Sequence, residues 1–361
     1  MHFKNFILVG FLSIVFSVGA FAQDFHYTQY FHSPLAINPA LAGAFNGSYR
    51  INGIVRDQYR GAADKAFTGF SLNVDAPIIR GIRKQDWVGI GLRLEQGTAG
   101  NAGQKINLYG LGASYHLSLD KKQTQILSLG VQYGTGGYSY NGNELIGDDT
   151  AFGSTLVFGA AGISMQAEEF QATGLPSGGN NSGGDIGGSL NDLTVGLLYN
   201  TKNVKNGTDF KVGIGVEGIL NPDRSANLPS ARSTDKKGIG INAFTSYEFE
   251  MTKRASLTSG IYYYTNKKAS AINVNSILNY KMKPENKLSL HAGLGLRNVR
   301  AGLIYLGASV KDIRVGLAYD IDISSATTAS GGHGGIELAV SYIGKIFKKP
   351  KPKPIIYCPR L

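Results

Sequence analysis

Much of this chain alternates apolar residues with small or polar ones. The alternation is clearest at residues 88–95, 109–119, 210–217, 287–297, 313–323 and 337–342. Successive side chains of a β-strand point to opposite faces, so a period of two gives each strand one apolar and one polar face. The pattern therefore predicts many amphipathic antiparallel strands.

A soluble sandwich or soluble barrel would show the same alternation, but three features favour a membrane barrel. The strands reach about ten residues, as a tilted crossing of a bilayer requires. The polar face is rich in Gly and Ser, and Tyr recurs near strand ends, as in the lumen and aromatic girdles of outer-membrane barrels. We predict an all-β fold, a transmembrane antiparallel β-barrel of about 14 strands within residues 47–347, since single-chain bacterial barrels have even strand counts.

The first 22 residues have the pattern of a cleaved signal peptide. Lys4 precedes a short apolar run at residues 6–18, and Ala20-Phe21-Ala22 forms a small-x-small cleavage site. The run is too short to span a membrane; the alternative is a buried N-terminal helix. We expect export and a multi-pass location in the bacterial outer membrane.

Residues 23–46 fit neither a strand nor a long helix. Pro34 and Pro39 interrupt the segment, Asn38-Pro39 is a turn signal, and its aromatic residues keep no period of two. The segment is apolar enough to need burial, and the lumen or periplasmic mouth of a barrel offers it. We predict an N-terminal plug, with a disordered leader as the alternative.

The connections differ in length, which predicts their side of the membrane. Tight polar turns are expected at 120–123 and 283–286, and long loops at 134–153, 171–192, 221–237 and 324–335. Short turns of such barrels lie in the periplasm and long loops lie outside.

After Phe347 the chain continues with a Lys/Pro-rich tail, residues 348–361, which we place in the periplasm. Alternating Lys and Pro favour an extended arm. The candidate partner-contact residues are Ile355, Ile356, Tyr357 and Arg360. The alternative is a solvated tail without a role.

Composition agrees with an exported barrel. The chain has 49 Gly, 17% charged residues and a net charge of +11, against a usual charged fraction of about 25%. An exported protein rarely meets nucleic acid, so we assign the basic surplus to the lumen, the tail or anionic lipid head groups of the outer membrane. Cys358 is the single cysteine, so no internal disulfide is possible.

We find no pattern typical of an enzyme. His26 and His32 have no metal-ligand spacing, and Asp320 and Asp322 fit loop or lumen charges better than a calcium loop. The Gly-x-Gly at 213–215 lies within a strand and not at a strand-to-helix turn. Glycines on the inner face would instead let a plug approach closely. We therefore predict a non-enzyme without cofactor or metal.

Both ends of the chain resemble the PorP/SprF family. The matching residues in the N-terminal part are Tyr27, Gln29, Tyr30, Pro34, Asn38, Pro39 and Gly43, followed by Arg56, Gln58 and Tyr59. Tyr59 stands where the family usually has Trp. Near the other end, residues 315–320 and 331–338 are similar to the family's final hairpin.

The resemblance implies an outer-membrane protein of the type IX secretion and gliding motility machinery of Bacteroidetes. It implies a role in protein secretion or cell surface anchoring of a large secreted protein such as an adhesin. The implied partners are that protein, other type IX secretion components and a peptidoglycan-binding periplasmic protein. The alternative function is a plugged transporter or channel for a small or apolar solute.

Overall fold

The computed structural model describes most of the mature chain. The described residues are 27–58, 60, 67–83, 85–99, 104–140, 186–203, 207–220, 238–266, 270–282, 287–323 and 332–346. The predicted signal peptide and tail lie outside these ranges, as do Tyr59 and the contact candidates Ile355, Ile356, Tyr357 and Arg360.

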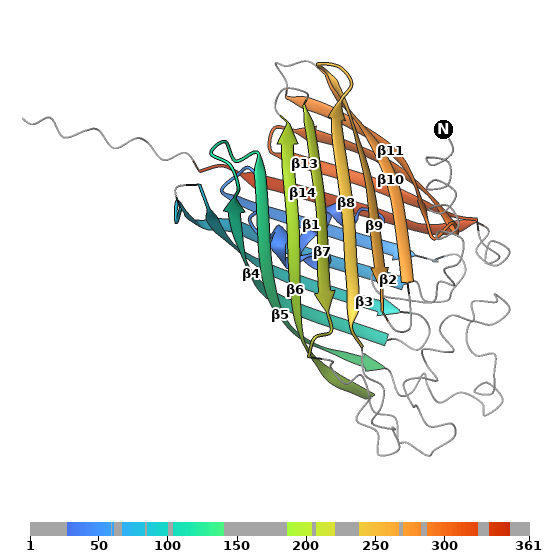
Figure 1. The fold of residues 1–361 in the computed structure, drawn as a ribbon. Coiled ribbons are helices and arrows are strands. Elements are labelled where there is room, and N and C mark those ends of the chain that lie inside the picture. Colours follow the sequence, from blue (N-terminus) through green and yellow to red (C-terminus); the bar gives the residue numbers. More distant parts are fainter. Residues whose placement is uncertain are drawn as a thin grey trace, which may run out of the picture.

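Fourteen antiparallel strands close into one barrel (Figure 1). Each strand pairs with its neighbours in the sequence, and β1 pairs with β14 to close the ring. The strands are β1 (Tyr49–Gln58), β2 (Phe67–Arg80), β3 (Trp87–Ala99), β4 (Gln104–Ser118), β5 (Gln125–Tyr140), β6 (Ile186–Asn203), β7 (Thr208–Glu217), β8 (Gly240–Glu250), β9 (Ala255–Thr265), β10 (Ser270–Lys281), β11 (Leu288–Arg297), β12 (Ala301–Val310), β13 (Ile313–Asp322) and β14 (His333–Gly344). The predicted fold class and strand count are confirmed.

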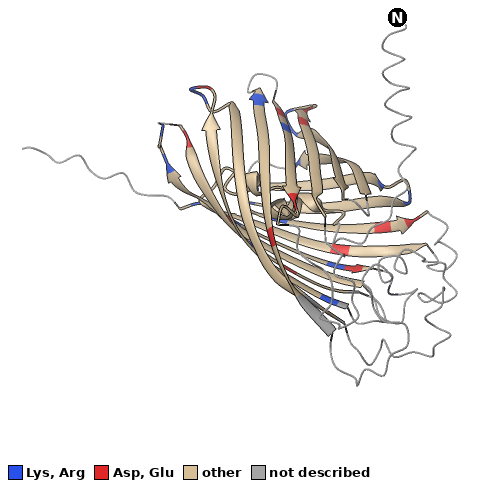
Figure 2. Ribbon diagram, turned by 60° about the horizontal axis from the view of Figure 1, so that its bottom comes forward, with Lys and Arg blue, Asp and Glu red and all other residues tan. Residues whose placement is uncertain are grey.

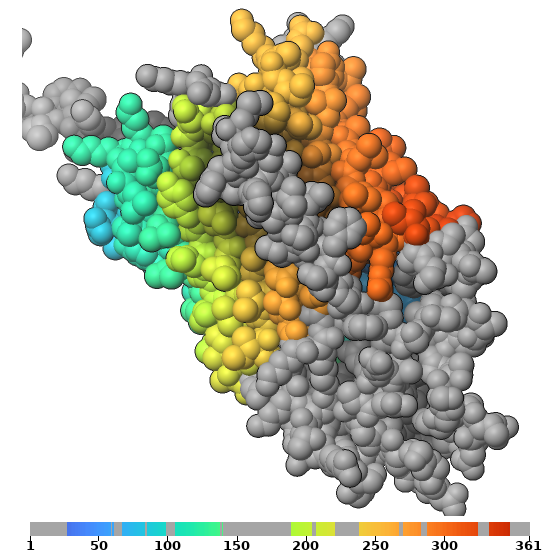
Figure 3. Space-filling view, turned by 45° about the vertical axis from the view of Figure 1, so that its right-hand side comes forward, coloured from blue at the N-terminus to red at the C-terminus, as the bar shows by residue number. Residues whose placement is uncertain are grey.

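The apolar set of the alternation lies on the outer surface. Leu290, Leu294, Val315 and Leu317 are exposed, and Leu294 reaches 70% exposure. Along β13 the exposed residues alternate with buried or half-buried ones over its whole length. The strands from β6 to β11 lie side by side in sequence order in the barrel wall, and Figure 3 shows their green, yellow and orange surfaces following one another. This outward apolar surface suits a lipid environment, because a soluble barrel would turn it inward.

The two ends of the barrel differ, and we call them the short-turn end and the long-loop end. The connection between β12 and β13 at the short-turn end is only Lys311-Asp312, and the predicted turn at 120–123 falls at the same end. The predicted turn at 283–286 lies outside the described residues, but β10 ends and β11 begins at this end. The chain enters β1 and leaves β14 at this end, where Tyr49 pairs with Gly344.

The strands that flank the predicted long loops begin or end at the opposite end of the barrel, but three of the predicted loop ranges were too wide. Residues 134–140 belong to β5, 186–192 to β6 and 333–335 to β14. The sequence there is rich in Gly, which is typical of a loop. It forms strand because β5 and β6 pair residue for residue as far as Tyr140 opposite Ile186.

Inside the ring lies the stretch of residues 27–47, here called the lumen segment (Figures 1 and 2). It contains three short helical turns, η1 (Tyr30–His32), α2 (Pro34–Ile37) and η2 (Pro39–Leu41). A proline begins each of the last two, where its missing N–H is not needed. Among the described residues, no helix is long and apolar enough to cross a membrane.

We predict that Leu294→Arg destabilises the membrane-inserted barrel by about 2–4 kcal/mol, the cost of a cation on the lipid face near mid-bilayer. The unfolding free energy in lipid vesicles measures this.

The neighbouring Gly293 faces inward, so cysteines placed at 293 and 294 should differ in labelling by a lipid-soluble probe. Equal labelling at both positions would contradict the assigned faces.

Candidate functional site

The first described residues of the lumen segment bind two acidic residues of the barrel wall. Glu337 on β14 accepts the backbone N–H groups of Thr28 and Gln29, with N···O distances of 2.6 and 2.9 Å. The Thr28 hydroxyl donates to Asp320 on β13 at 2.6 Å. Carboxylates bound by backbone N–H groups form the stronger class of hydrogen bond. The segment is therefore fixed to the wall at this point.

Two arginines balance these carboxylates. Arg56 on β1 lies 3.0 Å from Asp320 and 3.3 Å from Glu337, and Arg297 on β11 lies 2.8 Å from Asp320. Both carboxylate side chains are 1% exposed. A buried charge is strongly destabilising when its partner is missing. Here each of the two buried carboxylates has an arginine partner, so the network contains no unpaired charge.

The middle of the lumen segment is held by amide and hydroxyl groups. Asn38 donates its side-chain N–H to the backbone carbonyls of Leu197 and Ile214, both at 3.0 Å, and its oxygen accepts from the N–H of Ala40. Asn38 thus caps η2 and binds strands β6 and β7 with one side chain. The Ser33 hydroxyl lies 2.9 Å from the Ser71 hydroxyl of β2.

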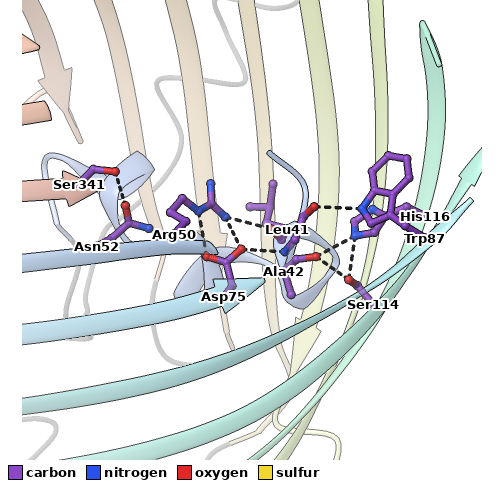
Figure 4. A network of polar contacts seen from close by, with 10 residues as sticks. Leu41, Ala42, Arg50, Asn52, Asp75, Trp87, Ser114, His116 and Ser341 are labelled. Atoms are coloured by element: carbon purple, nitrogen blue, oxygen red, sulfur yellow. Dashed lines mark hydrogen bonds and ion pairs between the residues drawn. The ribbon is translucent and has the colours of Figure 1, made fainter. Parts of the chain in front are cut away.

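The last part of the lumen segment binds Asp75 on β2 (Figure 4). Asp75 accepts the N–H of Gly43 at 2.7 Å and forms two hydrogen bonds with Arg50, at 2.8 and 2.9 Å. Arg50 also donates to the carbonyl of Leu41 at 3.1 Å, and Trp87 donates its ring N–H to the carbonyl of Gly43 at 3.0 Å. Strands β1, β2 and β3 therefore hold the segment where it turns toward β1.

Another group of contacts surrounds the carbonyl of Ala42 (Figure 4). This oxygen accepts from the Ser114 hydroxyl at 2.6 Å and from Nε2 of His116 at 2.7 Å. A carbonyl can only accept, so Nε2 of His116 carries the proton and Nδ1 accepts from Ser128 at 2.7 Å. Trp87 stacks on the ring, with centroids 4.6 Å apart. His116 is thus a positioned structural donor.

Aromatic contacts anchor the beginning of the segment. Tyr27 packs against Ile54 and Ala339, and Tyr30 stacks on Tyr262 with ring centroids 5.1 Å apart. Tyr27 and Tyr30 are therefore buried among apolar and aromatic side chains, as expected for a segment apolar enough to need burial.

His32, in the same part of the segment, is fully enclosed. Burial lowers the pKa of His32 to about 3, and the neighbouring Arg314, His291 and Arg50 lower this pKa further. The ring is therefore neutral at any physiological pH.

The barrel approaches the segment so closely at Gly89 and Gly130 that no side chain would fit. A Cβ atom at Gly130 would overlap the backbone of Ala40, and one at Gly89 would overlap the carbonyl of Ala42. The inner-face glycines thus permit backbone contact between strand and segment.

The structure brings together most of the residues singled out from the sequence. Seven of them, Tyr27, Gln29, Tyr30, Pro34, Asn38, Pro39 and Gly43, lie in the lumen segment, and Arg56 belongs to its binding network. Gln58 lies at the long-loop end of β1, opposite Phe67 and Gly335.

Sequence reasoning overlooked Asp75, His116 and Glu337. Asp75 and His116 showed only an inward polar position within an alternating strand. Glu337 and Asp320 also lay in the ranges similar to the family's final hairpin, and Asp320 was interpreted as a loop or lumen charge. The structure pairs Asp320 with Thr28 and with two arginines. Among the residues described, no group of three His, Cys, Asp or Glu side chains could hold a metal ion.

These features define a class: a closed outer-membrane β-barrel whose lumen contains its own N-terminal segment. The sequence assigns the family. The model for "Type IX secretion system membrane protein PorP/SprF" matches residues 19–342, and the chain belongs to this family. A comparison with curated protein sequences gave no match.

Solved outer-membrane barrels resemble this fold. The toluene transporter TbuX of Ralstonia pickettii matches with a TM-score of 0.50 and 10% identity, over 87% of this chain and 94% of that chain. The toluene transporter TodX of Pseudomonas putida matches with a TM-score of 0.49 and 11% identity, over 90% and 96% of the two chains. At such identity the likeness to TbuX concerns the fold alone.

We predict that Gly130→Ala displaces the lumen segment, because overpacking a tight contact costs about 1–3 kcal/mol. Hydrogen exchange measured by mass spectrometry should show faster exchange in peptides covering residues 39–44, by about tenfold. Gly134→Ala is the matched control on the same strand and face, since its Cβ would lie 3.7 Å from the nearest atom. Equal exchange in the two variants would refute the close contact at Gly130.

Proposed function

We propose that this protein is a non-enzymatic accessory barrel of the type IX secretion and gliding machinery. In this role it assists the export, or the anchoring at the cell surface, of a large secreted protein such as an adhesin. The observation that carries the proposal is the lumen segment, which is bound to β1, β2, β4, β6, β13 and β14 and so bridges opposite walls of the barrel. Membership of the PorP/SprF family supports the assignment to the type IX secretion system.

The chemistry of the described lumen supports a structural role. Asp75, Asp320 and Glu337 bind backbone N–H groups or a hydroxyl of the segment and are paired with arginines. His116 donates to a backbone carbonyl. These groups hold a polypeptide in place, which gives each of them a use other than catalysis.

A transporter of small or apolar solutes is the competing function. It would need the lumen segment to move, and movement would break charge-assisted hydrogen bonds at Glu337 and Asp75 together. Such bonds contribute about 1.5–3 kcal/mol each. The segment is thus better suited to a permanent seal than to a gate.

Partners are expected at both ends of the barrel. The short-turn end faces the periplasm if the usual rule for such barrels holds, and there the tail would meet other secretion components or a peptidoglycan-binding protein. The candidate contacts are Ile355, Ile356, Tyr357 and Arg360 in that tail. The long-loop end would face the exported protein outside the cell.

The seal can be tested by conductance in planar bilayers. The full mature chain should give no steady channel, whereas a chain lacking residues 24–43 should give steady channels and digest faster with protease. Heat-modifiable gel mobility serves as the control that both chains are inserted barrels. Steady channels of defined size from the full chain would instead favour transport.

The tail has its own test. We predict that truncation after Phe347 leaves the barrel inserted while surface display of its cognate exported protein, or pull-down of a periplasmic partner, falls sharply. Replacing Ile355, Ile356 and Tyr357 with Ser keeps the length and the charge of the tail and should have the same effect. Unchanged display and pull-down in both variants would leave the tail without a role.

A further inference from the structure

The short-turn end of the barrel carries a ring of exposed cations. Six connections lie at this end, from the one between β2 and β3 to the one between β12 and β13. Each has an exposed Lys or Arg in it or beside it, and Figure 2 shows several of these turns with blue segments. We call the following residues the basic rim: Arg83, Lys121, Lys202, Lys253, Lys287 and Lys311.

The nearest carboxylates on the β2–β5 side are engaged within the protein. Asp86 is 2% exposed, and it accepts the Tyr115 hydroxyl at 2.7 Å and the N–H of Ser118 at 3.0 Å. Asp120 accepts backbone N–H groups of its own turn. Arg83 is 3.8 Å from Asp86, and its side chain remains 70% exposed. The carboxylates are therefore turned inward while the cations face outward.

The rest of the short-turn end has the same bias. Among its described carboxylates, Glu250 and Asp312 are exposed, and Asp312 pairs with Lys345 at 3.3 Å. The side chains of Lys121 and Lys253 have no ion pair within the described part of the chain. Exposed cations thus outnumber exposed carboxylates, and the end presents a positive surface.

Exposed apolar side chains accompany the rim cations along the chain. Apolar residues that are 48–56% exposed come one or two positions before Arg83, Lys121, Lys253 and Lys311, and they are Ile82, Leu119, Met251 and Val310. This repeated order places each of these cations directly after an apolar residue of the surface.

Strand β12 shows where this order lies relative to the membrane. Ile304, Leu306 and Val310 are exposed on its outer face, which is the face assigned to lipid, and Lys311 follows Val310. The apolar surface ends at Val310, so Lys311 lies at the height of the lipid head groups. Lysine and arginine keep their apolar stems along such a surface while the charged group reaches the polar layer.

We infer that the basic rim binds the phosphate groups of anionic phospholipids in the leaflet at the short-turn end. Juxtamembrane Lys and Arg are attracted by an anionic lipid surface. An acidic protein would be served by a patch on one side, whereas these cations occur at every connection around the ring. The inference does not depend on the proposed role in secretion.

The contact would also fix the depth of the barrel in the membrane. Each cation is one or two residues from an apolar side chain that belongs in hydrocarbon. A shift of the barrel toward either leaflet would then move cations away from the phosphates or apolar side chains into water.

The test uses the full mature chain in an uncharged detergent. It is titrated with dioctanoyl phosphatidylglycerol, which has one negative charge, or with dioctanoyl phosphatidylcholine, which has the same chains and no net charge. Native mass spectrometry counts the lipids that the protein retains. We expect at least tenfold higher affinity for phosphatidylglycerol.

Combining Lys121→Gln with Lys253→Gln removes two rim charges from different turns. It should lower the affinity for phosphatidylglycerol by tenfold or more, since each cation near an anionic surface contributes about fivefold, and it should leave phosphatidylcholine binding unchanged. Lys121→Arg with Lys253→Arg keeps both charges and should bind as the wild type does.

The matched control combines Arg60→Gln with Lys105→Gln, which removes two exposed cations at the long-loop end and should leave the lipid affinity unchanged. Unfolding temperatures without lipid show that each variant is folded. The inference is overturned if the two lipids bind equally, or if the control loses as much affinity as the rim variant. Displacement of the lipid by inorganic phosphate at constant ionic strength would also overturn it, because the rim would then hold any anion.

Discussion

A ring of fourteen strands is too wide for its own inward side chains to close, and the lumen segment fills that space. Barrels of about eight strands are filled by their side chains, whereas those of 16–18 strands leave a water-filled channel. In this barrel the polar inner face binds a polypeptide in place of water. Asp75, Asp320 and Glu337 would otherwise be carboxylates facing an empty pore.

The same constraint explains the two kinds of residue on the inner face. Where the segment's backbone must touch a strand, the strand has glycine, as at Gly89 and Gly130. Where the segment exposes backbone N–H or carbonyl groups, the strand has a matching partner, as Glu337 does for Thr28. Short helical turns leave many backbone groups unpaired, so a segment of this kind needs a polar wall.

The sequence predicted the barrel well because alternation is a local signal, and the pattern in β13 is visible without any partner strand. It misplaced the ends of β5 and β6, because Gly-rich sequence resembles a loop until its pairing is known. The contacts of the segment could not be predicted, since Thr28 and Glu337 are 309 residues apart. The motif residues of the family were found, whereas most of their partners on the wall were not.

The lumen segment lies against the inner wall of the inserted barrel, and a disulfide between the segment and the wall can test this placement. The hydroxyls of Ser33 and Ser71 lie 2.9 Å apart, so cysteines at both positions, in a Cys358→Ser background, should cross-link on mild oxidation and give one linked peptide by mass spectrometry. Ser33→Cys paired with Ser259→Cys is the control, because Ser259 lies on the outer face beside Ser276. Linkage of position 33 to position 71 alone is the expected result, whereas no linkage there, or equal linkage to positions 71 and 259, would contradict the account.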